Sequence, residues 1–149
     1  MPSESDLIKL YSGKILKMAA EPIYRERLSE PDASVTKRSP LCGSAITVDL
    51  NVESGVITHY GQEVRACALG QASSTIIGKA IVGRSFTEVQ RAYKELSDML
   101  KNEGPTPSKP FEELYMLKPA SEYKNRHASI LLALEATLAA FQQIEKNDC

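Results

Sequence analysis

The sequence predicts an α+β domain, in which a small antiparallel sheet in the first half of the chain packs against helices. Two stretches of alternating apolar and polar residues, about 44–53 and 56–65, are separated by a short link that contains Gly55. This pattern is typical of a β-hairpin. Beyond residue 66 the apolar residues recur at helical spacing instead. A sheet region followed by a run of helices indicates the α+β class.

The chain before the hairpin is predicted to contain one helix and one short strand. The helix spans about 6–20, because Leu10, Ile15 and other apolar residues recur on one face and Pro22 follows its end. The polar stretch 24–40 suits a loop that contains at most a short third strand, near 33–37.

Four further helices are predicted after the hairpin, at about 69–82, 86–101, 111–117 and 125–145. Ser85 and Glu88 form a capping-box pattern at the start of the second. Gly104–Pro107 and Pro119 separate the later ones. The last helix has one apolar face, made of Ile130, Leu131, Leu134, Leu138 and Phe141.

Length and charge narrow the class of protein. A chain of 149 residues is long enough for one domain with its own core, so we take 1–149 as a single domain. The net charge of −1 provides no basic field for nucleic acid. No apolar run is long enough to span a membrane, and lysines interrupt residues 1–20 where a signal peptide would need an apolar core. We therefore expect a cytoplasmic protein that binds neither nucleic acid nor membranes.

Two internal cysteines are the first candidates for chemistry. Three cysteines without an export signal do not indicate a disulfide framework, and Cys149 lies on a polar tail. Cys67 falls at the start of a helix, where free N–H groups favour negative charge. Cys42 precedes the first hairpin strand and Cys67 follows the second, so antiparallel pairing places both at one end of the sheet. Two thiols make half of a tetrahedral metal site.

Two histidines could complete such a site. His59 lies in the middle of the second hairpin strand, where a solvated face of the sheet is expected. His127 opens the last helix, where it is either a surface or capping residue or a ligand.

Three motifs carry a resemblance to a known family. They are Ser39–Pro40–Leu41–Cys42–Gly43, then Cys67 followed by Ala72–Ser73–Ser74, then Gly83–Arg84–Ser85–Phe86. In this order, around a hairpin and before a final helix, they resemble the U-type iron–sulfur cluster assembly scaffolds: the NifU-like N-terminal domain and the IscU and SufU proteins. The resemblance extends from about Leu7 to Phe141.

The resemblance implies a function. Such scaffolds hold a nascent cluster, or zinc when isolated, between three cysteines and an aspartate. They receive sulfur from a cysteine desulfurase and pass the cluster to recipient proteins. They turn over no substrate alone, so we expect the chain not to be an enzyme.

The chain departs from the family pattern at several positions. Ser44 stands where the family has its aspartate. The third cysteine is missing: one alignment puts Ser129 at its place, and a shorter one puts His127 there or next to it, as a substitute ligand. The segment Leu117–Lys118–Pro119–Ala120–Ser121 keeps little of the family's chaperone-recognition motif, so no chaperone binding is inferred.

These observations predict a divergent scaffold or carrier for iron and sulfur. Its ligands would be Cys42, Cys67 and His127, with Ser44 and Ser129 as weak neutral oxygens, because a serine hydroxyl loses its proton far less readily than a thiol. Such a set could hold zinc, iron, or a labile [2Fe-2S] cluster that is shared across a homodimer or completed by an outside thiol.

Two alternatives come from other classes of protein. One is a metal-free descendant that acts as an interaction protein for a desulfurase or a cluster recipient. The other is a thiol enzyme with Cys42 or Cys67 as nucleophile and His127 as base. The second ranks last, because the sequence supplies no orienting carboxylate.

Overall fold

The computed structural model describes residues 13–20, 26–39 and 43–147. The elements in chain order are α2 (Gly13–Ala20), β1 (Ala33–Ser39), β2 (Ser44–Glu53), β3 (Val56–Arg65), α3 (Ala68–Ile81), α4 (Phe86–Asn102), the 3₁₀ helix η1 (Glu112–Glu122) and α5 (Lys124–Asn147). The α+β class is confirmed, and both hairpin strands have the predicted bounds.

The sheet has three antiparallel strands in the order β1-β2-β3. Ser39 pairs with Ser44 across the β1–β2 turn, and Ala45 pairs with Arg65 across the hairpin. The first turn and the end of β3 therefore lie at the same end of the sheet. On β2, Ile46, Val48 and Leu50 are buried, as the alternation of the sequence predicts.

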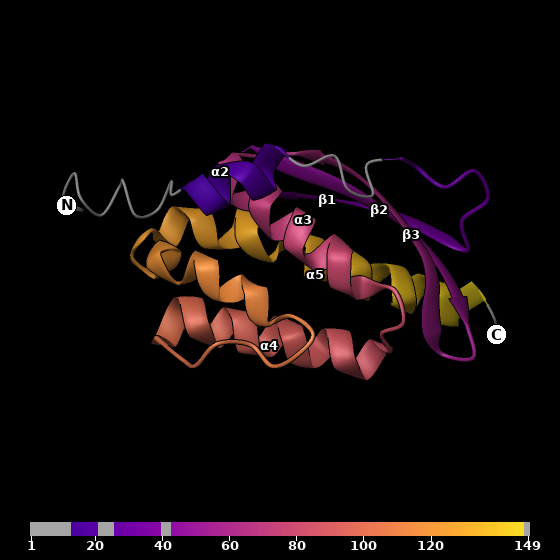
Figure 1. The fold of residues 1–149 in the computed structure, drawn as a ribbon. Coiled ribbons are helices and arrows are strands. Elements are labelled where there is room, and N and C mark those ends of the chain that lie inside the picture. The colour runs from indigo at the N-terminus through magenta and orange to yellow at the C-terminus, as the bar shows by residue number, and fades with distance from the viewer. Residues whose placement is uncertain (1–12, 21–25, 40–42, 148–149) are drawn as a thin grey trace.

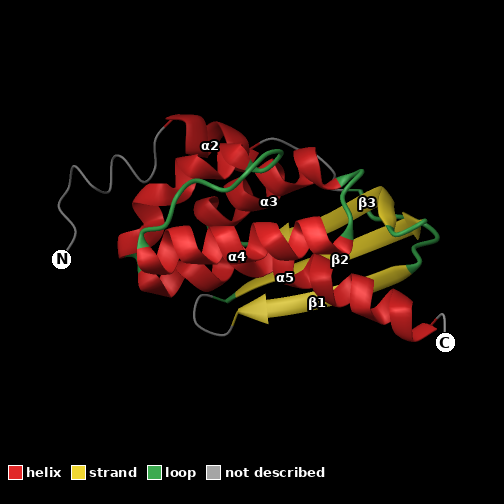
Figure 2. Ribbon diagram, turned by 90° about the horizontal axis from the view of Figure 1, so that it is seen from below, coloured by secondary structure: helices red, strands yellow, loops and turns green. Residues whose placement is uncertain are grey.

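The helices cover one face of the sheet in two layers (Figures 1 and 2). The long helix α5 packs on β1 and β2, while α3 packs on β3 and beside α5. The helix α4 packs on the other side of α5, with η1 against it, and α2 lies on α3. This arrangement buries the predicted apolar face of α5, including Ile130, Leu131 and Leu134.

The opposite face of the sheet is covered in part by the chain that precedes β1. Asp49 points to this face from β2 and is fully buried. Its carboxylate accepts hydrogen bonds from Arg27 Nε at 2.7 Å, Ser34 Oγ at 2.6 Å and the backbone N–H of Leu28 at 3.0 Å. Burial alone raises the pKa of Asp49, but these hydrogen bonds outweigh it, and the pKa lies below its ordinary value.

Some predicted bounds differ from those in the structure. The third strand is longer than 33–37, because its pairing with β2 continues to Ser39. The helix predicted at 111–117 continues as a 3₁₀ helix to Glu122 with Pro119 inside it, so Pro119 does not end the element. The predicted helix 6–20 is described from Gly13 onward, and its first residues lie outside the described ranges. Among the described helices, none is long and apolar enough to cross a membrane.

Candidate functional site

Cys67 lies at the predicted helix start. It is the N-cap residue of α3, with an extended backbone conformation (φ −66°, ψ 171°), and its side chain caps no backbone N–H. The residue is half-buried. The thiol is therefore held at the junction of β3 and α3, where other groups can approach it.

Two serines join Cys67 from distant parts of the chain. Ser129 on α5 places its Oγ 3.9 Å from Cys67 Sγ. The same hydroxyl lies 2.9 Å from Ser44 Oγ, at the first residue of β2. Both serines are only 2 % exposed, so the pair is enclosed by the protein. We call Ser44, Cys67 and Ser129 the thiol–serine cluster.

A glycine allows α5 to approach this closely. A Cβ atom on Gly70, in the first turn of α3, would lie against Ser129 Oγ and 2.8 Å from Ala66 Cβ. Another buried bond joins the same helices, from Ser73 Oγ to the carbonyl oxygen of Ile130 at 2.6 Å. The small residues of α3 thus bring the start of α5 against Cys67.

Cys42 lies outside the described residues, so its meeting with Cys67 stays a prediction. The residues on either side of the gap are described. Gly43 donates from its backbone N–H to the carbonyl oxygen of Ser39 at 2.9 Å and has φ +69°. Ser44 follows directly and belongs to the thiol–serine cluster.

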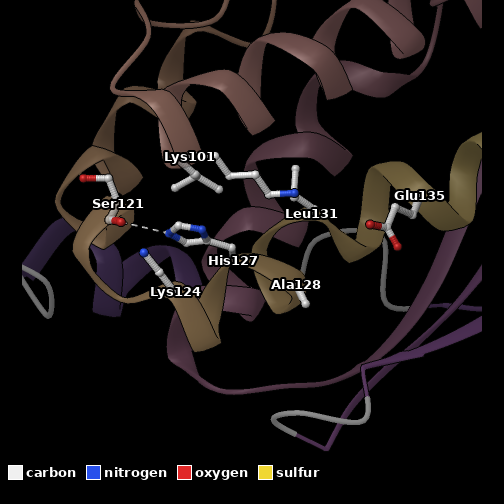
Figure 3. A pocket seen from close by; sticks show the side chains of 8 residues that line it. Lys101, Ser121, Lys124, His127, Ala128, Leu131 and Glu135 are labelled. Carbon is white, nitrogen blue, oxygen red and sulfur yellow. Dashed lines mark hydrogen bonds between the residues drawn. The ribbon is translucent and has the colours of Figure 1, made fainter.

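The structure does not bring His127 into the cluster. Its Nε2 lies 3.0 Å from the carbonyl oxygen of Ala120 and 3.1 Å from that of Ser121, both on η1 (Figure 3). Two positions along a helix correspond to a turn of about 200°, so His127 and Ser129 leave α5 on different sides. To act as a ligand beside Cys67, the imidazole would have to leave both carbonyl groups. His59 is exposed on β3, as expected, and its Nδ1 lies 3.3 Å from Thr58 Oγ1.

The donor set of the described cluster is one thiol and two hydroxyls. A thiolate binds zinc and iron strongly, whereas a serine hydroxyl is a weak neutral ligand. Within the described ranges, no group of three or more His, Cys, Asp or Glu side chains could hold a metal ion. A metal ion or cluster bound here would need Cys42 or ligands from another molecule.

The sequence alone did not reveal that the two serines bond to each other. They are 85 residues apart, and the sequence predicts only a separate hydroxyl oxygen at each position. The small residues of α3 were the available signal, because they indicated that another backbone comes close.

Comparisons with known proteins agree with this fold. The family described as NifU-like N terminal domain matches residues 10–130. A NifU-like protein (N-terminal) from Brucella abortus has a solved structure with a TM-score of 0.91 and 39% sequence identity, over 95% of this chain and 98% of that one.

Two scaffold proteins are also similar. The iron–sulfur cluster assembly scaffold protein IscU of Thermotoga maritima is 25% identical over 92% of this chain and 96% of its own. A protein of Fervidobacterium islandicum, described as a scaffold for the SUF system, shares the fold with a TM-score of 0.79 at 18% identity, over 90% of this chain and 98% of that one. The family match covers well over half of the chain, and the chain belongs to the NifU-like N-terminal domain family.

Proposed function

We propose that the protein is an iron–sulfur cluster assembly scaffold or carrier whose cargo is held at the thiol–serine cluster. The observation that carries this proposal is the convergence of Cys67, Ser44 and Ser129 at one end of the sheet. The name of the similar Thermotoga maritima protein supports the same function.

Cys67 and Cys42 are the proposed thiolate ligands. The two serines add hydroxyl oxygens, which bind iron and zinc weakly. His127 is a third ligand only if its ring turns away from η1. We propose that the remaining positions on the cargo are filled from outside, by a second copy of the chain in a homodimer or by a free thiol. Iron or a transient [2Fe-2S] cluster would then be held loosely, and zinc could take the same thiolates in the isolated protein.

The partners follow from the cargo. A cysteine desulfurase would supply sulfur to the thiols, and recipient proteins would take the finished cluster. In this role the protein accepts and releases cargo but turns over no substrate alone, so we propose that it is not an enzyme.

The test is reconstitution with iron and sulfide after anaerobic purification of the whole chain, with iron and acid-labile sulfide measured per protein. Cys42→Ala and Cys67→Ala should each remove most of the bound iron and sulfide. His127→Gln should retain them, because the ring faces η1. The matched control is Ser97→Ala, a half-buried serine of α4 outside the site.

Ser44→Asp tests the missing carboxylate directly. It returns the ligand type that the family has at this position, so bound iron should increase and the cluster should survive longer in air. The new carboxylate would be buried, so the unfolding temperature of Ser44→Asp should be lower than that of the wild type in the absence of metal. Added zinc should raise the unfolding temperature of this variant again.

The second candidate function is a metal-free interaction protein for a desulfurase or a cluster recipient. The hydrogen bond between Ser44 and Ser129 favours it, because the two hydroxyls satisfy one another without a metal. If the wild-type chain retains no more iron and sulfide than Cys67→Ala, the scaffold proposal fails. A desulfurase that still binds the chain would then support this second function.

A further inference from the structure

The strand β1 forms one edge of the sheet. In the order β1-β2-β3 it has a hydrogen-bonded neighbour on one side only, and Figure 2 shows it at the rim of the sheet. An edge strand presents backbone N–H and C=O groups that can pair with another chain. The direction of these groups along β1 decides where such pairing can occur.

One hydrogen bond shows which residues of β1 point outward. The backbone N–H of Ser34 donates to Gln143 Oε1 on α5 at 3.3 Å. In an antiparallel pair the N–H and C=O groups of every second residue point to the same side, so those of Thr36 and Arg38 also point away from β2. The Oγ1 atoms of Thr36 and Thr47 lie 2.8 Å apart, which agrees with the closer side chains of a pair whose backbones do not bond to each other.

The outward groups of Thr36 and Arg38 are available for pairing. Gln143 covers the N–H of Ser34, nearer the start of β1. Among the described residues, none bonds to the outward backbone groups of Thr36 or Arg38. An extended segment laid along this part of the edge could therefore pair with both N–H and both C=O groups, as in recognition by strand addition.

The side chains of the same stretch determine the chemistry of a partner. Lys37 and Arg38 are exposed, and neither makes an ion pair or hydrogen bond with a residue in the described ranges. Neighbours in a strand alternate, so these two cations lie on opposite faces of the sheet. Val35 lies on the same face as Lys37 and packs half-buried against the core. Acidic side chains opposite both cations and an apolar one opposite Val35 would complement this edge.

We propose that the edge of β1, from Val35 to Arg38, binds an extended acidic segment of a partner protein by strand addition. The backbone of Thr36 and Arg38 supplies the pairing, and the side chains of Lys37 and Arg38 select for negative charge. A second copy fits less well, because pairing two β1 edges over this stretch sets cations against cations. The proposal goes beyond cluster assembly and does not depend on which residues hold iron.

Two capped hexapeptides serve as probes. When TEETVT runs antiparallel to β1, its glutamates lie opposite Lys37 and Arg38 and its valine lies opposite Val35, whereas TKKTVT carries lysines in place of the glutamates. Each is titrated into the whole chain at low ionic strength, and binding is followed by backbone amide chemical shifts. TEETVT should bind about tenfold more tightly, because two cross-strand charge pairs change from attractive to repulsive in TKKTVT. The shifts should centre on β1.

Thr36→Pro tests the backbone pairing. Proline is tolerated in an edge strand where the N–H faces outward, and it removes the group that an added strand would use. Thr36→Val is the matched control, because it keeps the N–H and loses the same hydroxyl contact with Thr47. Thr36→Val should bind TEETVT like the wild type, and Thr36→Pro about fivefold more weakly. An unchanged amide spectrum outside β1 without peptide verifies the fold of both variants.

Lys37→Glu combined with Arg38→Glu tests the charge. This double variant should reverse the preference, so that TKKTVT binds more tightly than TEETVT. Lys94→Glu combined with Lys101→Glu makes the same change in net charge at two exposed positions of α4, outside β1. This control should keep the preference of the wild type.

Several results would overturn the proposal. They are equal binding of the two peptides by the wild type, shifts that centre away from β1, and equal binding of TEETVT by Thr36→Pro and Thr36→Val. Self-association of the chain without peptide that Thr36→Pro abolishes would assign this edge to a second copy, and it would overturn the proposal as well.

Discussion

Ser44 and Ser129 are 85 residues apart in the sequence, and their hydroxyl oxygens lie 2.9 Å apart in the fold. Each is buried, and Ser129 also lies beside Cys67. This bond joins the first residue of β2 to α5 at the place where cargo is proposed to bind. Its contribution to stability can be separated from any contribution to metal binding.

We expect Ser44→Ala and Ser129→Ala each to lower the free energy of unfolding by about 1–2 kcal/mol, because each leaves the other hydroxyl buried without this partner. The double variant should lose less than the sum, by about 1 kcal/mol, because neither hydroxyl then remains in place without the other. Urea denaturation of the metal-free protein measures all three. Ser44→Ala combined with Ser85→Ala, at the distant start of α4, serves as the additive control. Additivity of the serine pair would mean that the two hydroxyls do not depend on one another.

Gly70→Ala should destabilise the protein by about 1–3 kcal/mol, as overpacking of a tight core does. The added methyl group would press on Ser129 Oγ and Ala66 Cβ, so α5 would have to move away from Cys67. Gly13→Ala is the matched control, because a Cβ at Gly13 has no neighbour within 4 Å among the described residues. We expect it to leave thermal unfolding unchanged or raise stability by about 0.5 kcal/mol. Equal effects of the two substitutions would contradict the close approach.

The buried carboxylate of Asp49 should make stability depend on acid pH. The pKa of Asp49 is lower in the folded protein than in the unfolded chain. Its contribution is therefore complete above the unfolded value of about 3.9 and is lost as pH falls through the lower folded value. In Asp49→Asn this part of the acid dependence should disappear.

Arg27→Met removes the positively charged partner of Asp49. It removes the bonds at 2.7 and 3.1 Å but leaves those from Ser34 and Leu28. We expect a loss of about 2 kcal/mol at neutral pH, because the buried carboxylate keeps only part of its partners. Urea unfolding at several pH values between acid and neutral measures both variants. Identical pH profiles for the wild type and Asp49→Asn would refute the role of Asp49.

The start of α4 should respond to changes in its capping box. Ser85 Oγ accepts from the backbone N–H of Glu88 at 3.3 Å, and the Glu88 carboxylate accepts from the backbone N–H of Ser85 at 3.2 Å. We expect Ser85→Ala to cost about 1 kcal/mol, whereas Ser85→Asp keeps a capping oxygen and stays near the wild type. Thermal unfolding monitored by circular dichroism gives the comparison. A loss in Ser85→Asp as large as in Ser85→Ala would show that the capping oxygen is not what matters.

The sequence predicted most of the fold because the relevant signals are local. Alternation over 44–53 and 56–65 gave both hairpin strands, and the Ser85–Glu88 pattern gave the start of α4. The course of η1 through Pro119 was missed, because a proline is normally taken as a helix end and the packing of Leu114 and Leu117 into the core is not a local property.

The position of the described cysteine could be predicted from the sequence, but the residues that lie beside it could not. The position of Cys67 follows from the strand before it and the small-residue helix after it. The directions of His127 and Ser129 depend on how α5 is rotated against α3 and η1, and no short-range pattern encodes that rotation. The ion pair between Arg27 and Asp49 could not be predicted either, because it joins residues that are far apart in the chain.

The place of α5 in the chain has a consequence for biosynthesis. It begins at Lys124, after every other described element, yet it covers the apolar face of β1 and β2. While the ribosome is still translating α5, the apolar face of β1 and β2 lacks the helix that covers it, and the nascent chain is prone to aggregate. Ser129, near the start of α5, also emerges long after Cys67. We expect the thiol–serine cluster to form only once the start of α5 has left the ribosome, so cargo loading follows the emergence of this helix.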